Sequence, residues 1–219
     1  MTPEQRFAHA ETMVSEGRLI QGEWSRIASG GRRLGCALHA LGDDVNSATD
    51  CPADIAPEWA ARLILPMFDG LRGDGLVFFA HNYIPALRMM QGADAAAWRR
   101  VMVEVLITSL TVALPHNRDG VVQPVIDLLY REKRGDIPLA AEWMAARAAA
   151  YAAWEAGAVD AAAVAARAAA EAAWEAGEAE EEAAGDAAAY AVGAARKGAA
   201  AWDTISRAFL AAMMKGGAK

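Results

Sequence analysis

The chain has 219 residues, of which 55% are apolar, and a formal net charge of −7. This apolar content can fill a sizeable core, which excludes disorder over most of the length. Acidic residues outnumber basic ones both in residues 1–139 and in residues 140–219. The charge therefore argues against direct nucleic-acid binding and against docking on an anionic membrane, since both need a basic surface.

The beginning of the chain lacks the charged-then-apolar pattern of a signal peptide. The longest uncharged run, 105–117, has thirteen residues, fewer than the roughly twenty that a transmembrane helix needs. Two cysteines, Cys36 and Cys51, are too few for a secreted disulfide scaffold, although one bridge remains open. We expect a cytoplasmic protein that has no contact with membranes.

The first predicted helix covers residues 3–17. Thr2 can cap it, a proline occupies its first position, and Gln5 can complete a capping box. Residues 18–31 are ambiguous between a short strand and an irregular turn. A second helix is expected at 32–41, where three leucines recur at helical spacing.

Turn-forming residues fill 42–56, which predicts a loop. Four helices are expected to follow it. Asp94 is the predicted cap of one, and Pro85 would have to form a kink inside another. Their expected ranges are 57–70, 76–90, 95–114 and 121–134.

An alanine-rich tail, 137–219, follows an N-terminal helical region, 1–136. Within the tail the sequence 151–157 recurs in altered form at 171–177, with a glycine closing each copy. Alanine is the strongest helix former, and glycine often marks helix ends. The expected tail helices are 138–156, 160–176 and 178–213. The sequence thus predicts an all-α multi-helix bundle with an alanine-rich C-terminal helical hairpin or three-helix section.

A zinc site is one hypothesis for the residues near Cys36. Cys36 and His39 would lie on one face of the predicted helix, with Cys51 in the next loop. A fourth ligand would have to be His81 or His116, both distant in sequence. A small buried thiol beside a polar histidine explains the same residues without a metal.

A nucleophilic role for Cys36 is a second hypothesis. His81 or His116 would act as the base, and Asn82 or Asn117 would orient it. No elbow motif of the type Gly-x-Cys-x-Gly surrounds Cys36. We therefore predict no catalytic residue, no metal site and no cofactor, and keep a small Cys-dependent hydrolase or metal enzyme as an alternative.

The tail carries a row of carboxylates at the spacing i, i+4, i+7, i+11 and i+15, which is one face of a continuous helix. Like charges at this spacing cost roughly 0.2–0.5 kcal/mol per pair, so a cationic partner would relieve them. The alternative is helix capping, because acidic residues after Gly177 would favour a helix start. This acidic row consists of Glu171, Glu175, Glu178, Glu182 and Asp186.

Three aromatic residues, Trp143, Tyr151 and Trp154, follow the spacing i, i+8 and i+11, which we assign to one helix face. Core packing is the ordinary explanation of such a stripe. A partner surface is the alternative, because Trp and Tyr dominate interface hot spots. Alanines on the other faces would let a second copy approach closely, so a homodimer through the tail is also open.

The chain resembles uncharacterised alanine-rich proteins of alphaproteobacterial phages and prophages. The tail alone is similar to alanine-rich immunity proteins of toxin systems. The elements shared with the phage proteins are the opening Thr2-Pro3-Glu4-Gln5-Arg6-Phe7, the Gly22-Glu23-Trp24 step, Cys36-Ala37-Leu38, Cys51-Pro52-Ala53, the Pro57-to-Trp59 helix start and a tail that ends near Trp202.

The phage resemblance implies a mobile-element protein that binds a host component in the host cytoplasm, as anti-CRISPR and other anti-defence inhibitors do. We therefore predict a non-catalytic inhibitor of a host protein complex, with a CRISPR-type defence complex as a candidate target. The predicted contact surface is the acidic row together with Trp154 and Trp174. The similarity of the tail implies the alternative, an immunity protein that neutralises a cognate toxin.

Overall fold

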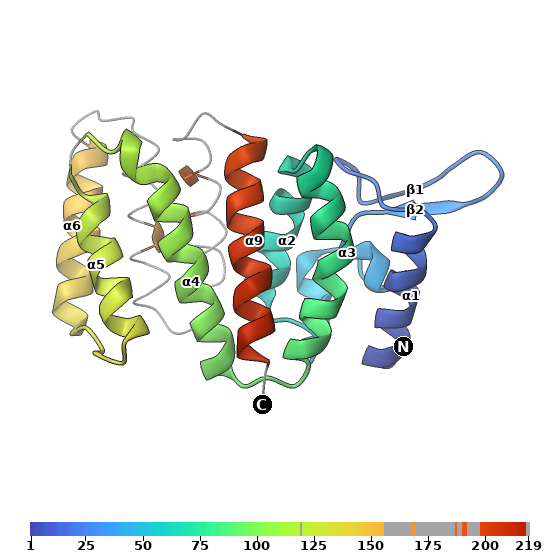
Figure 1. Ribbon diagram of the computed structural model, residues 1–219, viewed down its shortest axis with the longest axis horizontal. Coiled ribbons are helices and arrows are strands. Elements are labelled where there is room, and N and C mark those ends of the chain that lie inside the picture. The colour runs from blue at the N-terminus through green and yellow to red at the C-terminus, as the bar shows by residue number, and fades with distance from the viewer. Residues whose placement is uncertain (119, 156–167, 170–186, 188–189, 192–197, 218–219) are drawn as a thin grey trace.

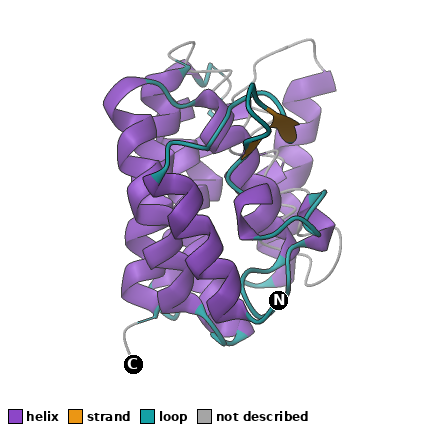
Figure 2. Ribbon diagram, turned by 90° about the vertical axis from the view of Figure 1, so that its right-hand side faces the viewer, coloured by secondary structure: helices purple, strands orange, loops and turns teal. Residues whose placement is uncertain are grey.

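The computed structural model describes residues 1–118, 120–155, 168–169, 187, 190–191 and 198–217. In these residues the protein is predominantly helical, and the all-α prediction is confirmed. A two-stranded antiparallel sheet is the exception, and Figure 2 shows how small it is beside the helices. The helices are α1 (Pro3–Ser15), α2 (Glu58–Gly70), α3 (Gly73–Met90), α4 (Ala95–Ala113), α5 (Val122–Lys133), α6 (Ala140–Glu155) and α9 (Ala199–Gly216). The strands are β1 (Ser25–Ile27) and β2 (Arg33–Gly35), and short 3₁₀ helices cover His39–Leu41, Ala48–Asp50 and Leu114–His116.

The helices do not follow one another in space as they do in sequence. From left to right, Figure 1 shows α6, α5, α4, α9, α3 and α1, with α2 close to α9 and α3. The last helix, α9, packs chiefly against α4 and α3 and also contacts α2. Residues 199–216 thus complete the core of the helices that precede the alanine-rich segment.

Aromatic rings connect three of these helices. Trp59 of α2 meets Trp98 of α4 edge to face, with ring centroids 5.9 Å apart. Trp59 also meets Phe209 of α9, with centroids 6.4 Å apart. All three side chains are buried, and each such ring pair adds roughly 0.5–1.5 kcal/mol beyond the area it buries. The aromatic cluster therefore makes α9 part of the central core.

The helix starts predicted from capping residues are confirmed. The backbone N–H of Gln5 donates to Thr2 Oγ1 at 3.3 Å, and the Thr2 N–H donates to Gln5 Oε1 at 2.8 Å, which completes the capping box. Asp94 Oδ1 accepts from the Ala97 N–H at 2.7 Å at the start of α4. Pro85 lies inside α3, as expected. The capping residues alone were therefore enough to locate the starts of α1 and α4.

The predicted helix at 32–41 is wrong. The segment instead forms β2, which pairs Gly35 with Ser25 of β1, and then a 3₁₀ helix from His39 to Leu41. The imidazole of His39 packs so closely on Gly35 that a Cβ there would lie 2.6 Å from His39 Cδ2. The leucine spacing that suggested a helix reflects burial in the tertiary core, not helical periodicity.

The tail is described in part. The expected helix at 138–156 is confirmed as α6, and the end of the expected helix at 178–213 is confirmed as α9, which begins after Gly198 at φ +40°. The expected helix at 160–176 and the hairpin arrangement lie outside the described residues, apart from the buried helical pair Ala168 and Ala169. Within the described part, no helix combines the length and apolar character that crossing a bilayer requires.

Candidate functional site

The two cysteines are buried free thiols, so the open disulfide is not formed. Cys36 follows β2, and its Sγ accepts a hydrogen bond from the backbone N–H of His39 at 3.4 Å. The two residues are therefore not on one face of an α-helix, as the zinc hypothesis assumed. Burial raises the pKa of the Cys36 thiol and raises that of Cys51 to about 11. A reactive cysteine needs the opposite shift, towards the thiolate. This environment argues against the Cys-dependent hydrolase alternative.

The histidines proposed as ligands or bases are dispersed. His39 is 2% exposed and its Nδ1 lies 3.1 Å from the Val45 carbonyl oxygen, which occupies that nitrogen. His81 lies on the exposed side of α3, and His116 lies in the 3₁₀ helix after α4. Among the described residues, no three His, Cys, Asp or Glu side chains gather as a metal site would require. The residues proposed as zinc ligands around Cys36 are therefore not brought together in the fold.

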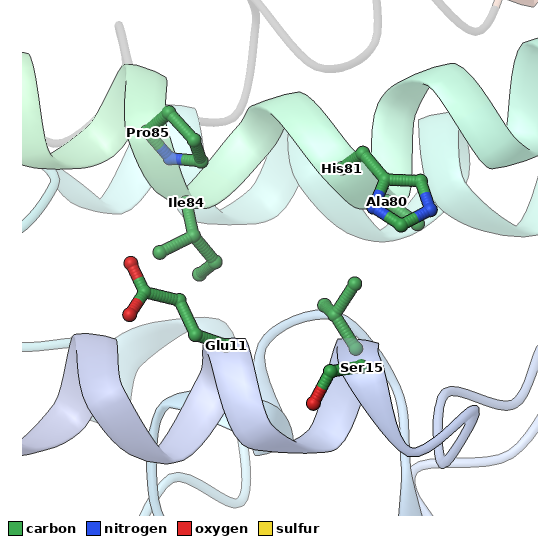
Figure 3. A pocket seen from close by; sticks show the side chains of 7 residues that line it. Glu11, Ser15, Ala80, His81, Ile84 and Pro85 are labelled. Atoms are coloured by element: carbon green, nitrogen blue, oxygen red, sulfur yellow. The ribbon is translucent and has the colours of Figure 1, made fainter.

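A small cavity of about 170 Å³ between α1 and α3 contains residue types of a catalytic triad (Figure 3). Glu11 and His81 occupy opposite ends of it, and the Ser15 hydroxyl points away from the imidazole. Ser15 Oγ donates to the Thr12 carbonyl at 3.0 Å, and Glu11 Oε1 accepts from Arg88 Nη2 at 2.8 Å. Glu11 thus bonds α1 to α3, the Ser15 hydroxyl bonds within α1, and the three side chains do not form a triad.

The predicted partner-binding residues fall largely outside the described residues. The acidic row of Glu171, Glu175, Glu178, Glu182 and Asp186 lies there, as does Trp174. Trp154 belongs to α6, but its side chain is outside the described part. The acidic row with its two tryptophans therefore stays a prediction.

The aromatic stripe proposed for the tail is wrong for its first two members. Trp143 is buried at 4% exposure against the rest of the core, whereas Tyr151 is 43% exposed. A spacing of eight residues leaves an offset of about 80° around a helix of 3.6 residues per turn. Burial of Trp143, Ala146 and Ala150 therefore turns Tyr151 towards solvent.

The outward side of α6 is mainly apolar over residues 140–153, the part of the helix whose side chains the structure describes. Met144 is 56% exposed, and the other exposed positions of the helix in this part are alanines, Tyr151 and Arg147. Arg147 is exposed at the margin of this side, one helical turn before Tyr151, and Glu142 lies further round the helix. An exposed helix side normally carries polar residues, and a helix that is apolar all round is normally covered on every side. This outer face of α6 consists of Ala140, Ala141, Met144, Ala145, Ala148, Tyr151 and Ala152.

Two further apolar side chains precede the outer face of α6. Ile137 is 78% exposed and Leu139 is 70% exposed, in the connection between α5 and α6. The connection is held by Arg131, which bonds Asp136 at 2.8 Å and Glu142 at 2.6 Å. Because these ion pairs fix the turn, Ile137 and Leu139 are displayed at the surface at the edge of the molecule where α6 lies (Figure 1).

No protein family model matches the chain, and curated proteins and solved structures likewise gave no match. The sequence had not singled out Ile137, Leu139 or Met144. The sequence carries no distinct signal for them, since Glu142, Arg147 and Glu155 make α6 about as charged as the rest of the chain. Their exposure is known only from the position of α6 at an edge of the fold.

Proposed function

We propose that the protein binds and inhibits a host protein complex without catalysing a reaction, and that the outer face of α6 is its main contact. The observation that carries the proposal is the exposure of Met144 and Tyr151 on the outer face of α6, with Ile137 and Leu139 exposed just before the helix. Contiguous exposed apolar surface on a water-soluble helix commonly marks an interaction site. The proposed partner presents an apolar groove into which this helix fits.

The residue types support this contact. Tyr is enriched at interface hot spots, and Met adapts its shape to irregular surfaces. Fully burying a side chain of this size contributes roughly 1.5–3 kcal/mol. Four such side chains, Ile137, Leu139, Met144 and Tyr151, can supply the centre of an interface. The alanines would let a partner helix approach closely.

The resemblance to phage proteins makes a bacterial defence complex of the CRISPR type the first target to test. The acidic row would then act as a second contact, on a basic surface of that complex. The two contacts respond differently to salt, because screening weakens exposed charge pairs and leaves apolar burial largely unaffected. Loss of binding at raised salt would therefore assign the partner to the acidic row.

The test is the plating efficiency of a targeted phage on a host with an active CRISPR-type system. Expression of the protein is expected to restore plating, and the variant Met144→Lys with Tyr151→Lys is expected to lose that effect. The matched control, Val77→Lys, changes an exposed apolar residue on α3, far from α6. Unchanged plating with the wild-type protein, or equal rescue by the Met144→Lys, Tyr151→Lys variant, would contradict the proposal.

A second copy of the chain is the competing occupant of the outer face of α6, as in the homodimer considered from the sequence. Sedimentation velocity over a range of protein concentrations separates the two. We expect no dimer that depends on Met144. A dimer abolished by Met144→Lys would assign the surface to self-association and overturn its assignment to a host partner.

A further inference from the structure

A groove of about 490 Å³ is lined by the beginning of α4 and the ends of α5 and α9. Figure 1 shows these helix ends at its lower edge. Small-molecule sites in proteins commonly have volumes of roughly 300–1,000 Å³. None of the lining residues belongs to the outer face of α6. A ligand in this groove would therefore be independent of the contact proposed for α6.

The lining of this groove is cationic. It contains four basic side chains and two acidic ones. Glu132 accepts two hydrogen bonds from Arg99, at 2.7 and 3.1 Å. Glu104 forms an ion pair with Lys133 at 2.6 Å. Both carboxylates are thus already matched by a cation, and they hold α4 against the end of α5.

The two remaining cations, Arg100 and Lys215, are exposed, and neither bonds to another residue of the described part. They leave a local excess of positive charge in a chain whose net charge is −7. Lys215 complements the C-terminal end of α9. Arg100 lies in the second turn of α4, near the positive end of that helix, where the helix dipole gives it no stabilisation. The charge of Arg100 is therefore available to an anion in the groove.

We propose that the groove binds a small anionic ligand through a compact dianionic group of the phosphate-ester type. The planar guanidinium of Arg100 matches two oxygens of such a group, and the Lys215 ammonium supplies a second, more adaptable charge. The side chains of Val103 and Ala212 offer an apolar wall for the rest of the ligand. The ligand would connect α4 with α9, so it stabilises the folded chain.

Isothermal titration and thermal unfolding with inorganic phosphate and with phenyl phosphate, at constant ionic strength set by sodium chloride, test this proposal. We expect both ligands to bind and to raise the melting temperature, with phenyl phosphate binding more tightly because its ring contacts Val103 and Ala212. Arg100→Glu and Lys215→Glu should each weaken binding at least tenfold, whereas Arg100→Lys should retain part of it. Circular dichroism checks that the variants fold.

The matched control is Arg32→Glu, which makes the same charge change at an exposed position before β2. It should leave the affinity for phenyl phosphate unchanged. An equal loss in Arg32→Glu would show that only the net charge matters, and the groove would not be the site. Failure of both ligands to bind the wild-type protein, or full affinity in Arg100→Glu and Lys215→Glu, would also overturn the proposal.

Discussion

Arg6 and Asp44 connect the first helix to the loop that follows the β-hairpin. Arg6 is 7% exposed and donates to both carboxylate oxygens of Asp44, at 2.7 and 2.5 Å, and to the Leu41 carbonyl at 3.3 Å. The pair therefore satisfies a guanidinium whose stem is enclosed by the core. It also leaves a signature in the dependence of stability on pH.

The hydrogen bonds from Arg6 lower the pKa of Asp44 from 3.8 to about 2. Because the folded-state pKa lies below the unfolded value, the stabilisation is complete above about pH 4 and is lost as the pH falls towards 2. Asp44→Asn should therefore lower the urea midpoint at pH 6, and the difference from wild type should vanish near pH 2. Urea titrations at both pH values measure this, and a difference that persists at pH 2 would contradict it.

Gly70 lies where α2 and α9 pack so closely that there is no room for a side chain. A Cβ at this residue, the last of α2, would overlap the indole ring of Trp202. Gly70→Ala should destabilise the protein by about 1–3 kcal/mol, the usual range for overpacking a core. Chemical denaturation measures the loss, and the second change Trp202→Leu should recover part of it by removing the overlap. No recovery would indicate that Gly70 acts through its backbone alone.

Among the helices and strands, the sequence predicted best those whose ends are fixed by residues close in the chain. Thr2 and Asp94 carry their own capping geometry, so the starts of α1 and α4 followed from them. The strand β2 depends on pairing with β1, and the Gly30-Gly31 turn between the two strands is the local signal of that hairpin. Which residues of α6 face solvent likewise depends on how α6 packs against α5, and the sequence does not show this packing. For this reason the sequence assigned Trp143 and Tyr151 to one face and missed Met144.

The acidic row makes a separate prediction at the scale of elements. Glu175→Lys with Glu178→Lys should weaken binding to a basic partner surface strongly without reducing helix content, since lysine is also a good helix former. Affinity and far-ultraviolet circular dichroism of the same samples check both parts. The matched control is Glu23→Lys with Glu58→Lys, two reversals elsewhere on the chain. Unchanged affinity in the Glu175→Lys, Glu178→Lys variant would remove the acidic row from the interface.

At the scale of the whole molecule, α9 joins the end of the chain to its middle. This long-range packing could not be predicted, because alanine-rich composition suggested a tail that packs on itself. Phe209 lies fully buried against Trp59. The core is therefore complete only when α9 packs against α2, α3 and α4.

Phe209→Ala tests that closure. It should cost about 3–5 kcal/mol, as expected for a large aromatic removed from a packed core. The loss should appear as one cooperative transition that involves α2, α4 and α9 together. Val77→Ala, at a position 57% exposed, is the control and should change stability by no more than about 0.5 kcal/mol. An early, separate melting of α9 in the variant would show that α9 is not part of a single unit.

We propose that the protein acts through partner binding at the outer face of α6. The most direct measurement compares host proteins that co-purify with the wild-type chain and with the Met144→Lys, Tyr151→Lys variant, quantified by mass spectrometry at low and physiological salt. We predict one host complex enriched by the wild type at both salt concentrations and lost with the variant. Equal recovery of that complex by the variant, or no enriched host protein, would contradict the claim.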